Sequence, residues 1–199
     1  MTLKLKTVVG LDPSLTGTGI ASSLGWCEVI GYTPRPNPLT GKREDHITKL
    51  PHRERMAAMR DVRNRVVTTI GCPDLVVMEL PAPSRSGGGA HERAWLWWEL
   101  YYTLTGGYVP VALMPNNGRA LYATGKGNAS KTAVVDAVAR RWPQWTTEGN
   151  DNAADAVVLM AAGKDWLKQS VGSVPQTHRK ALEKTIWPEF LDAEEGEAA

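Results

Sequence analysis

Carboxylates occur at three places in this chain where the surrounding sequence is apolar. Asp12 ends the β-branched run TVVGL, and Glu79 ends the similar run LVVM. Asp155 lies inside the apolar segment AADAVVLMAA, and Asp151 and Asn152 precede it at helical spacing. A buried carboxylate is costly unless it is paired with a cation or bound to a metal ion. These acids are therefore candidates for one shared site.

Acids gathered in one site repel one another, and hard divalent cations with oxygen ligands resolve that conflict. Two Mg²⁺ ions about 4 Å apart can activate water and stabilise the leaving oxygen in phosphodiester cleavage. The acids alone thus indicate a nuclease or another phosphoryl-transfer enzyme. Other interpretations stay open, since Asp12 or Glu79 taken singly is compatible with a turn residue or a helix cap. Asp151 is equally compatible with an acid favoured by the dipole at a helix start.

The elements that must position these acids alternate between strand and helix patterns. Strands are expected at residues 7–12, 19–24, 26–32, 74–79 and 108–114, with the tight turn TGTG joining the first two. Helices are expected at 52–70, at 94–104, from a cap at Asn128 or Ser130 to Trp142, at 153–166, and in a short piece around 177–185. Short connections make the first three strands an antiparallel meander. The fold class is therefore α/β, with a mixed five-stranded sheet flanked by helices.

Length and composition set the outer bounds. The 199 residues are expected to form one domain over residues 1–170, followed by a partly disordered tail over 171–199. The net charge of +2 does not itself indicate a nucleic-acid partner. The segment 42–65 is nevertheless rich in Lys and Arg, which fits either a polyanion partner or a solvated helix face. No segment approaches the roughly 18 apolar residues of a membrane span, so we expect no membrane partner and a cytoplasmic protein of a bacterial cell or phage-infected host.

Four motifs in fixed order add a specific resemblance. GLDPSLTGTGIA, VVMEL, GKGNASKTAVVDAV and NAADAVVLMAA resemble, over about residues 7–163, the RuvC family of Holliday junction resolvases, especially its phage-type members. The resemblance implies a ribonuclease H-like fold, a homodimer, and Mg²⁺ or Mn²⁺ as cofactor. It also implies symmetric nicking of four-way DNA junctions in recombination, repair or phage DNA processing.

The resemblance also assigns individual residues. The family's strand acids fall on Asp12 and Glu79, and its last helix acid falls on Asp155. The preceding helix acid of the family falls on Asn152, and the nearest carboxylate is Asp151, so either or both could complete the metal site. The family's lysine at a helix start falls on Lys131, where it would bind the scissile phosphate; the alternative is an exposed helix lysine.

Further DNA contacts are expected in two loops. Lys126 lies in a turn bounded by glycines, and Arg85 and Arg93 lie in the glycine-rich segment 81–93 after Glu79. His91 in the same segment is compatible with catalysis, with DNA binding or with plain solvent exposure. The family's aromatic wedge near this point has no counterpart, because no aromatic residue stands between Glu79 and Trp95.

The segment AWLWWELYYTL predicts a helix that is aromatic on two faces. One face carries Trp95, Trp98 and Tyr102, and another carries Trp97 and Tyr101. One face can pack on the sheet, and the other suits a symmetric partner chain. A helix wrapped entirely within one chain is the alternative.

The sequence therefore predicts a structure-selective, Mg²⁺-dependent DNA endonuclease that resolves four-way junctions. A broader nuclease for forks and other branched DNA is the nearest alternative. From other classes, a catalytically idle junction-binding scaffold and one lobe of an actin-like ATPase stay open, the latter because its phosphate loops also combine an acid with a glycine turn.

Overall fold

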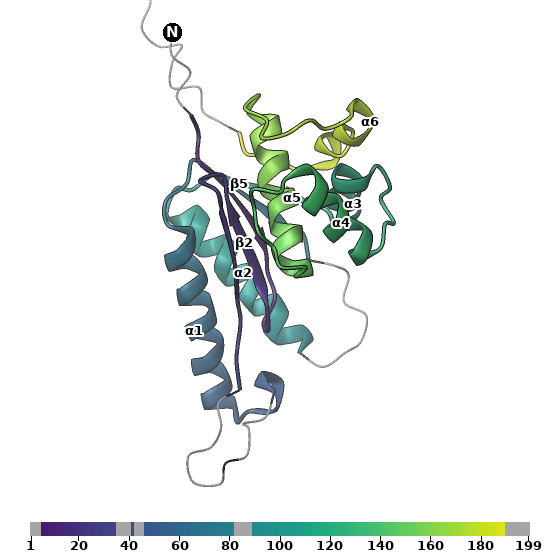
Figure 1. Cartoon of the computed structure of the whole chain (residues 1–199). Coiled ribbons are helices and arrows are strands. Elements are labelled where there is room, and N and C mark those ends of the chain that lie inside the picture. Colours follow the sequence, from purple (N-terminus) through teal and green to yellow (C-terminus); the bar gives the residue numbers. More distant parts are fainter. Residues whose placement is uncertain (1–4, 35–40, 42–45, 82–88, 190–199) are drawn as a thin grey trace, which may run out of the picture.

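The structure is a computed structural model, and it describes residues 5–34, 41, 46–81 and 89–189. Its centre is one five-stranded sheet with helices on both faces (Figure 1). The strands are β1 (Val8–Asp12), β2 (Thr18–Ser22), β3 (Trp26–Ile30), β4 (Leu75–Glu79) and β5 (Val111–Met114). The helices are η1 (Ile47–Lys49), α1 (His52–Ile70), α2 (Ala90–Gly106), α3 (Asn116–Thr124), α4 (Lys131–Arg141), α5 (Asp151–Trp166), α6 (Gln176–Arg179) and η2 (Leu182–Lys184).

The strand order is β3-β2-β1-β4-β5. The first three strands pair antiparallel, and β1, β4 and β5 run parallel to one another. The expected mixed sheet, antiparallel over its first three strands, is confirmed. The parallel pairs require crossovers, and α1 and α2 supply them.

Two apolar cores form because each face of the sheet carries its own helices. On one face, α1 and α2 cover a core that includes Leu11, Met78 and Leu100. On the other face, α5 lies across β1 and β2, with α3 and α4 packed outside it (Figure 1). The α5 helix is buried almost all round, from Ala153 to Asp165, as its uniformly apolar sequence predicts.

The contact between α5 and the sheet is close because glycine lies beneath it. A Cβ atom on Gly10 would overlap the backbone of Ala156 and Met160, and one on Gly19 would overlap the carbonyl of Asn152. Near the other end of α5, a Cβ atom on Gly163 would come within 2.7 Å of Val8 and Val77 side chains. Glycine at these positions therefore sets the distance between helix and sheet.

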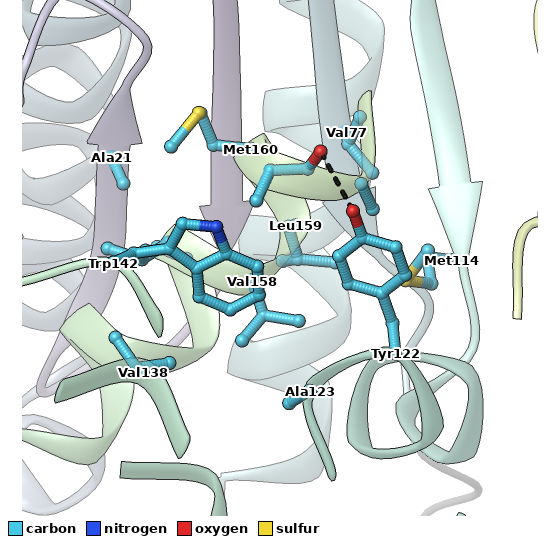
Figure 2. Close-up of a cluster of buried hydrophobic side chains, with 14 of the residues drawn as sticks. Ala21, Val77, Met114, Tyr122, Ala123, Val138, Trp142, Val158, Leu159 and Met160 are labelled. Carbon is cyan, nitrogen blue, oxygen red and sulfur yellow. Dashed lines mark hydrogen bonds between the residues drawn. The ribbon is translucent and has the colours of Figure 1, made fainter. Parts of the chain in front are cut away.

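Aromatic residues fill the space between α5 and the outer helices. The rings of Tyr122 and Trp142 stack with centroids 6.1 Å apart, and both are fully buried (Figure 2). The Tyr122 hydroxyl donates to the carbonyl oxygen of Ala161 at 3.3 Å (Figure 2). This packing fixes α3 and α4 against α5.

The chain after α5 folds back onto the same layer. Arg179 of α6 donates to Asp165 at 2.7 Å, and Trp187 stacks on Trp166 with centroids 4.4 Å apart. Ile186 and Leu113 exchange two backbone hydrogen bonds, which adds a short antiparallel bridge at the edge of β5. The boundary expected at residue 170 stays a prediction, and residues 190–199 of the acidic end lie outside the described part.

Arginines of α1 link that helix to α2. Arg55 binds Glu92 at 2.6 Å, and Arg63 binds Glu99 at 3.3 Å. Part of the basic segment 42–65 therefore serves helix packing, while Lys42 and Arg43 lie outside the described residues. Met56 of α1 is 45% exposed, whereas Val62 is buried. No described helix is both long and apolar enough to cross a membrane.

The α-helix that was not predicted from the sequence is α3. It begins after Pro115, whose carbonyl accepts the amide of Arg119, and it ends at Gly125 in the left-handed region at φ +82°. Its opening residues, Asn116, Asn117 and Gly118, are typical of turns, so the local sequence masks the helix.

Candidate active site

Asp12 and Glu79 end neighbouring parallel strands. The register pairs Leu11 of β1 with Met78 of β4, so the next residue of each strand is Asp12 and Glu79. Leu11 and Met78 face α1 and α2. Because side chains alternate along a strand, the two carboxylates face the opposite layer, which contains α5.

Asp155 completes this group from the helix side. It lies in the second turn of α5 and is almost fully buried. The close packing of α5 on Gly10 and Gly19 holds this turn against the ends of β1 and β2. The structure thus brings together three of the acids that the sequence singles out.

Two residues of α3 bind these acids, and neither was expected from the sequence. The guanidinium of Arg119 donates through Nε to Glu79 and through Nη1 to Asp155. Asn116 donates from Nδ2 to the other carboxylate oxygen of Glu79 at 3.1 Å. Arg119 is almost fully buried, and the two residues lie one helical turn apart. The isolated arginine in the apolar stretch RALYA was the one available signal.

Asp12 is less well compensated than its neighbours. Burial raises its pKa to about 7, the negative charge of Glu79 adds to the rise, and Arg119 and Lys131 oppose it. The structure gives its carboxylate no hydrogen-bond donor among the residues it describes. In the metal-free protein, ionisation of the Asp12 carboxylate therefore costs folding free energy at neutral pH.

This raised pKa predicts a pH dependence of stability. The folded protein binds the Asp12 proton more tightly than the unfolded chain, so metal-free stability falls as pH rises from about 4 to about 7. Asp12→Asn removes the cost, and we expect it to raise stability above pH 7 by on the order of 3 kcal/mol. Urea unfolding in EDTA at pH 5 and pH 8 measures this. An equal response of both proteins to pH would show that Asp12 does not carry the effect.

Asp151 and Lys131 form an ion pair at the edge of the group. Asp151 is the first residue of α5 and Lys131 is the first of α4. The hydrogen bond from Lys131 is the main cause that lowers the pKa of Asp151. Ser130 caps α4 through a bond from the Ala133 amide at 3.2 Å, which settles the choice between Asn128 and Ser130. Lys131 stays largely exposed despite the pair.

Asn152 lies against the glycine turn between β1 and β2. A Cβ atom on Gly17 would lie 2.7 Å from its side-chain nitrogen, and its carbonyl covers Gly19. The glycines of this turn are therefore needed to seat α5, and the helix covers the surface that would otherwise meet a phosphate. Thr18 closes the turn by donating from Oγ1 to the Ser14 carbonyl at 2.6 Å.

Of the other residues expected to contact DNA, the structure describes Lys126 and Arg93. Lys126 is exposed in the turn between α3 and α4, and Arg93 is exposed in the first turn of α2. His91, beside it, is also exposed. Arg85 lies outside the described residues.

The donor chemistry of the acids fits a hard divalent cation, since all three offer carboxylate oxygens. Within the described part of the chain, however, no three His, Cys, Asp or Glu side chains are gathered closely enough to hold a metal ion as they stand. Arg119 bridges two of the three acids. The acids thus have the chemistry of metal ligands, but the guanidinium of Arg119 occupies one oxygen of Glu79 and one of Asp155.

Comparison with known proteins identifies the fold. No protein-family model and no curated protein matches the chain. The Thermus thermophilus RuvC structure matches 85% of this chain and 99% of its own, with a TM-score of 0.52 and 16% identity. T. thermophilus RuvC in complex with Holliday junction substrate matches 86% of this chain and all of its own, with a TM-score of 0.55 and 17% identity. The chain has the ribonuclease H-like fold of RuvC.

A further solved structure, the yeast mitochondrial Holliday junction resolvase Ydc2, covers 88% of this chain and 80% of its own at 14% identity and a TM-score of 0.48. The two RuvC structures confirm the fold implied by the four sequence motifs. The functional roles of individual residues stay predictions.

Proposed function

We propose that this chain is a structure-selective DNA endonuclease that resolves four-way junctions by metal-dependent phosphodiester hydrolysis. The observation that carries the proposal is the convergence of Asp12, Glu79 and Asp155 on one face of a RuvC-like sheet. The likeness to a RuvC solved with a Holliday junction substrate supports branched DNA as the partner.

Asp12, Glu79 and Asp155 would hold the metal ion, with Asp151 or Asn152 as a further ligand. Mg²⁺ is the proposed ion, one or two per site, with Mn²⁺ as a substitute, because hard oxygen ligands suit both. When bound, the ion supplies activation of water and neutralisation of charge on the scissile phosphate. A buried group of three acids with only partial compensation is the kind of site that gains from such an ion.

Lys131 is the proposed contact to the scissile phosphate. Asp151 holds it at the start of α4, and its exposure leaves the ammonium accessible to a DNA strand. Lys126 and Arg93 would contact flanking phosphates on either side, and Arg85 would join them from the glycine-rich segment. His91 is exposed close to Arg93.

A homodimer is proposed through the outer face of α2. Trp97 is buried against the sheet, whereas Trp98 and Tyr102 are 62% and 73% exposed, one helical turn apart. Two exposed aromatic residues on one helix face favour a self-complementary contact. Two copies would present two active sites to opposite strands of a symmetric junction.

The dimer gives a direct prediction. The double substitution Trp98→Glu and Tyr102→Glu is expected to shift the protein from dimer to monomer in light scattering after size exclusion. Leu24→Glu is the matched control, because Leu24 is 72% exposed in the turn between β2 and β3. A monomeric wild type would contradict the proposed dimer, and a dimer that survives the double substitution would place the interface elsewhere.

The competing interpretations differ in the activity that they predict. A lobe of an actin-like ATPase is disfavoured, because α5 covers the glycine turn that would have to hold phosphate. A junction-binding scaffold without activity is disfavoured by the retained group of acids. A broader nuclease for forks shares the same site and differs only in substrate range.

The function is tested with a panel of labelled four-way, forked and linear duplexes, incubated with Mg²⁺ or with EDTA. The proposal expects cleavage of the four-way junction in Mg²⁺, little cleavage of the linear duplex, and none in EDTA. Equal cleavage of forks would support the broader nuclease. Tight junction binding without any cleavage would support the scaffold.

A further inference from the structure

Arg119 is the one buried cation in the group of acids among the residues that the structure describes. It comes from α3, and its guanidinium spans two elements, since it binds Glu79 at the end of β4 and Asp155 in α5.

The guanidinium of Arg119 keeps its positive charge. Arginine stays protonated at all accessible pH values, so a change of pH does not remove the positive charge of Arg119 from the site. Its helix is held firmly, because Ala120, Tyr122 and Ala123 beside it are buried in the core over α5. Removing one partner from such a buried ionic group leaves an uncompensated charge, which is strongly destabilising.

The same contacts occupy oxygens that a metal ion would need. Arg119 takes one carboxylate oxygen of Glu79 and one of Asp155, and Asn116 takes the second oxygen of Glu79. Within the described residues, the acids do not form a ready metal site as they stand. A cation that binds between Glu79 and Asp155 must therefore replace donors that are already there.

The net charge of the site also bears on how a metal ion could bind. Asp12, Glu79 and Asp155 carry three negative charges when ionised, and Arg119 supplies one positive charge. Asp151 and Lys131 cancel each other beside them. Because Arg119 cannot lose its charge, the net charge of the group matches a single divalent ion more closely than two.

We propose that Arg119 is the resident cation of this site, which holds Glu79 and Asp155 together in the metal-free protein and gives them up when a divalent ion binds. It is a positioning residue, because it acts on the acids and not on the DNA. Metal binding and the Arg119 bridge then exclude each other. This inference rests on the proposed metal-dependent function, which it deepens.

The test compares Mn²⁺ binding and thermal stability in the full chain. Free Mn²⁺ is measured by electron paramagnetic resonance during titration of EDTA-stripped wild type, Arg119→Gln and Arg119→Lys. We expect Arg119→Gln to lower the melting temperature of the metal-free protein. We also expect it to bind Mn²⁺ about tenfold more tightly than wild type. A neighbouring cation lowers the proton affinity of a carboxylate by about tenfold or more, and we expect a similar effect on the affinity for Mn²⁺. Arg119→Lys keeps the charge but loses the two-pronged bridge, so its affinity should lie between the two.

Arg179→Gln is the matched control. Arg179 pairs with Asp165, another buried aspartate of α5, outside the proposed site. Its loss should lower the melting temperature without changing the Mn²⁺ affinity. Lower stability combined with tighter metal binding is a signature that a merely structural arginine would not give.

The outcomes separate the inference from the function beneath it. If wild type binds Mn²⁺ and cleaves junctions while Arg119→Gln binds Mn²⁺ no more tightly, the inference is wrong and the function stands. If wild type neither binds Mn²⁺ nor cleaves, the proposed function is wrong and the inference is wrong with it. Should Arg119→Gln not fold without metal, Arg119→Lys decides: tighter binding than wild type supports the inference, and equal binding overturns it.

Discussion

Replacing Asp155 with Asn is expected to abolish junction cleavage while junction binding persists. Asp155 is buried at the meeting point of α5 and the strand ends, and Asn lacks the negative charge that would hold a metal ion there. A catalytic metal supplies several kcal/mol of transition-state stabilisation, so we expect a loss of about a thousandfold or more. Cleavage of a labelled four-way junction measures the rate, and gel mobility shift measures the binding.

Asp165→Asn is the control for that substitution. Asp165 is also a buried aspartate of α5, but it binds Arg179 and Tyr122 far along the helix from the strand ends. Its variant should be less stable and should still cleave at a temperature where it is folded. Wild-type cleavage by Asp155→Asn would remove this residue from the site, and equal loss in both variants would trace the effect to stability.

Replacing Gly10 with Ala is expected to be strongly destabilising. A Cβ atom at this position would overlap backbone atoms of Ala156 and Met160, which cannot rotate away as a side chain can. We expect the free energy of unfolding to fall by about 3 kcal/mol or more, as in other overpacked cores. The displaced α5 would also carry Asp155 away from Asp12, so cleavage should fall in the folded fraction.

Urea unfolding of Gly10→Ala measures the loss, and Gly106→Ala is the matched control. Gly106 is the last residue of α2, and a Cβ atom there would meet nothing within 4 Å. That variant should stay within about 0.5 kcal/mol of wild type. Equal stability of Gly10→Ala and Gly106→Ala would mean that α5 does not rest directly on β1.

The sheet and its acids could be predicted because their signals are local. Apolar runs of strand length that end on an acid marked β1 and β4, and the uniformly apolar segment around Asp155 marked a buried helix. The parallel register that sets Asp12 beside Glu79 follows once both strands are known. The exposed and buried faces of the aromatic helix α2 also agree with its spacing.

Other parts of the site could not be predicted because their causes are tertiary. The helix α3 opens with turn-forming residues, and core packing of Tyr122 and Ala123 stabilises it against that local preference. The role of Arg119 can be recognised only once Glu79 and Asp155 are known to lie on either side of it. The glycines at the β1–β2 turn read as a phosphate loop in sequence, and the covering helix gives them a packing role instead.

The most direct test of the central claim is strand-resolved mapping of cuts in a four-way junction. Each of the four strands is labelled in turn, and the products formed by wild type in Mg²⁺ are sized to the nucleotide. The account predicts paired cuts at symmetry-related phosphates of two opposite strands, absent in EDTA and absent with Asp155→Asn. Cuts confined to one strand, cuts of equal yield in linear duplex, or cuts that persist in EDTA would contradict it.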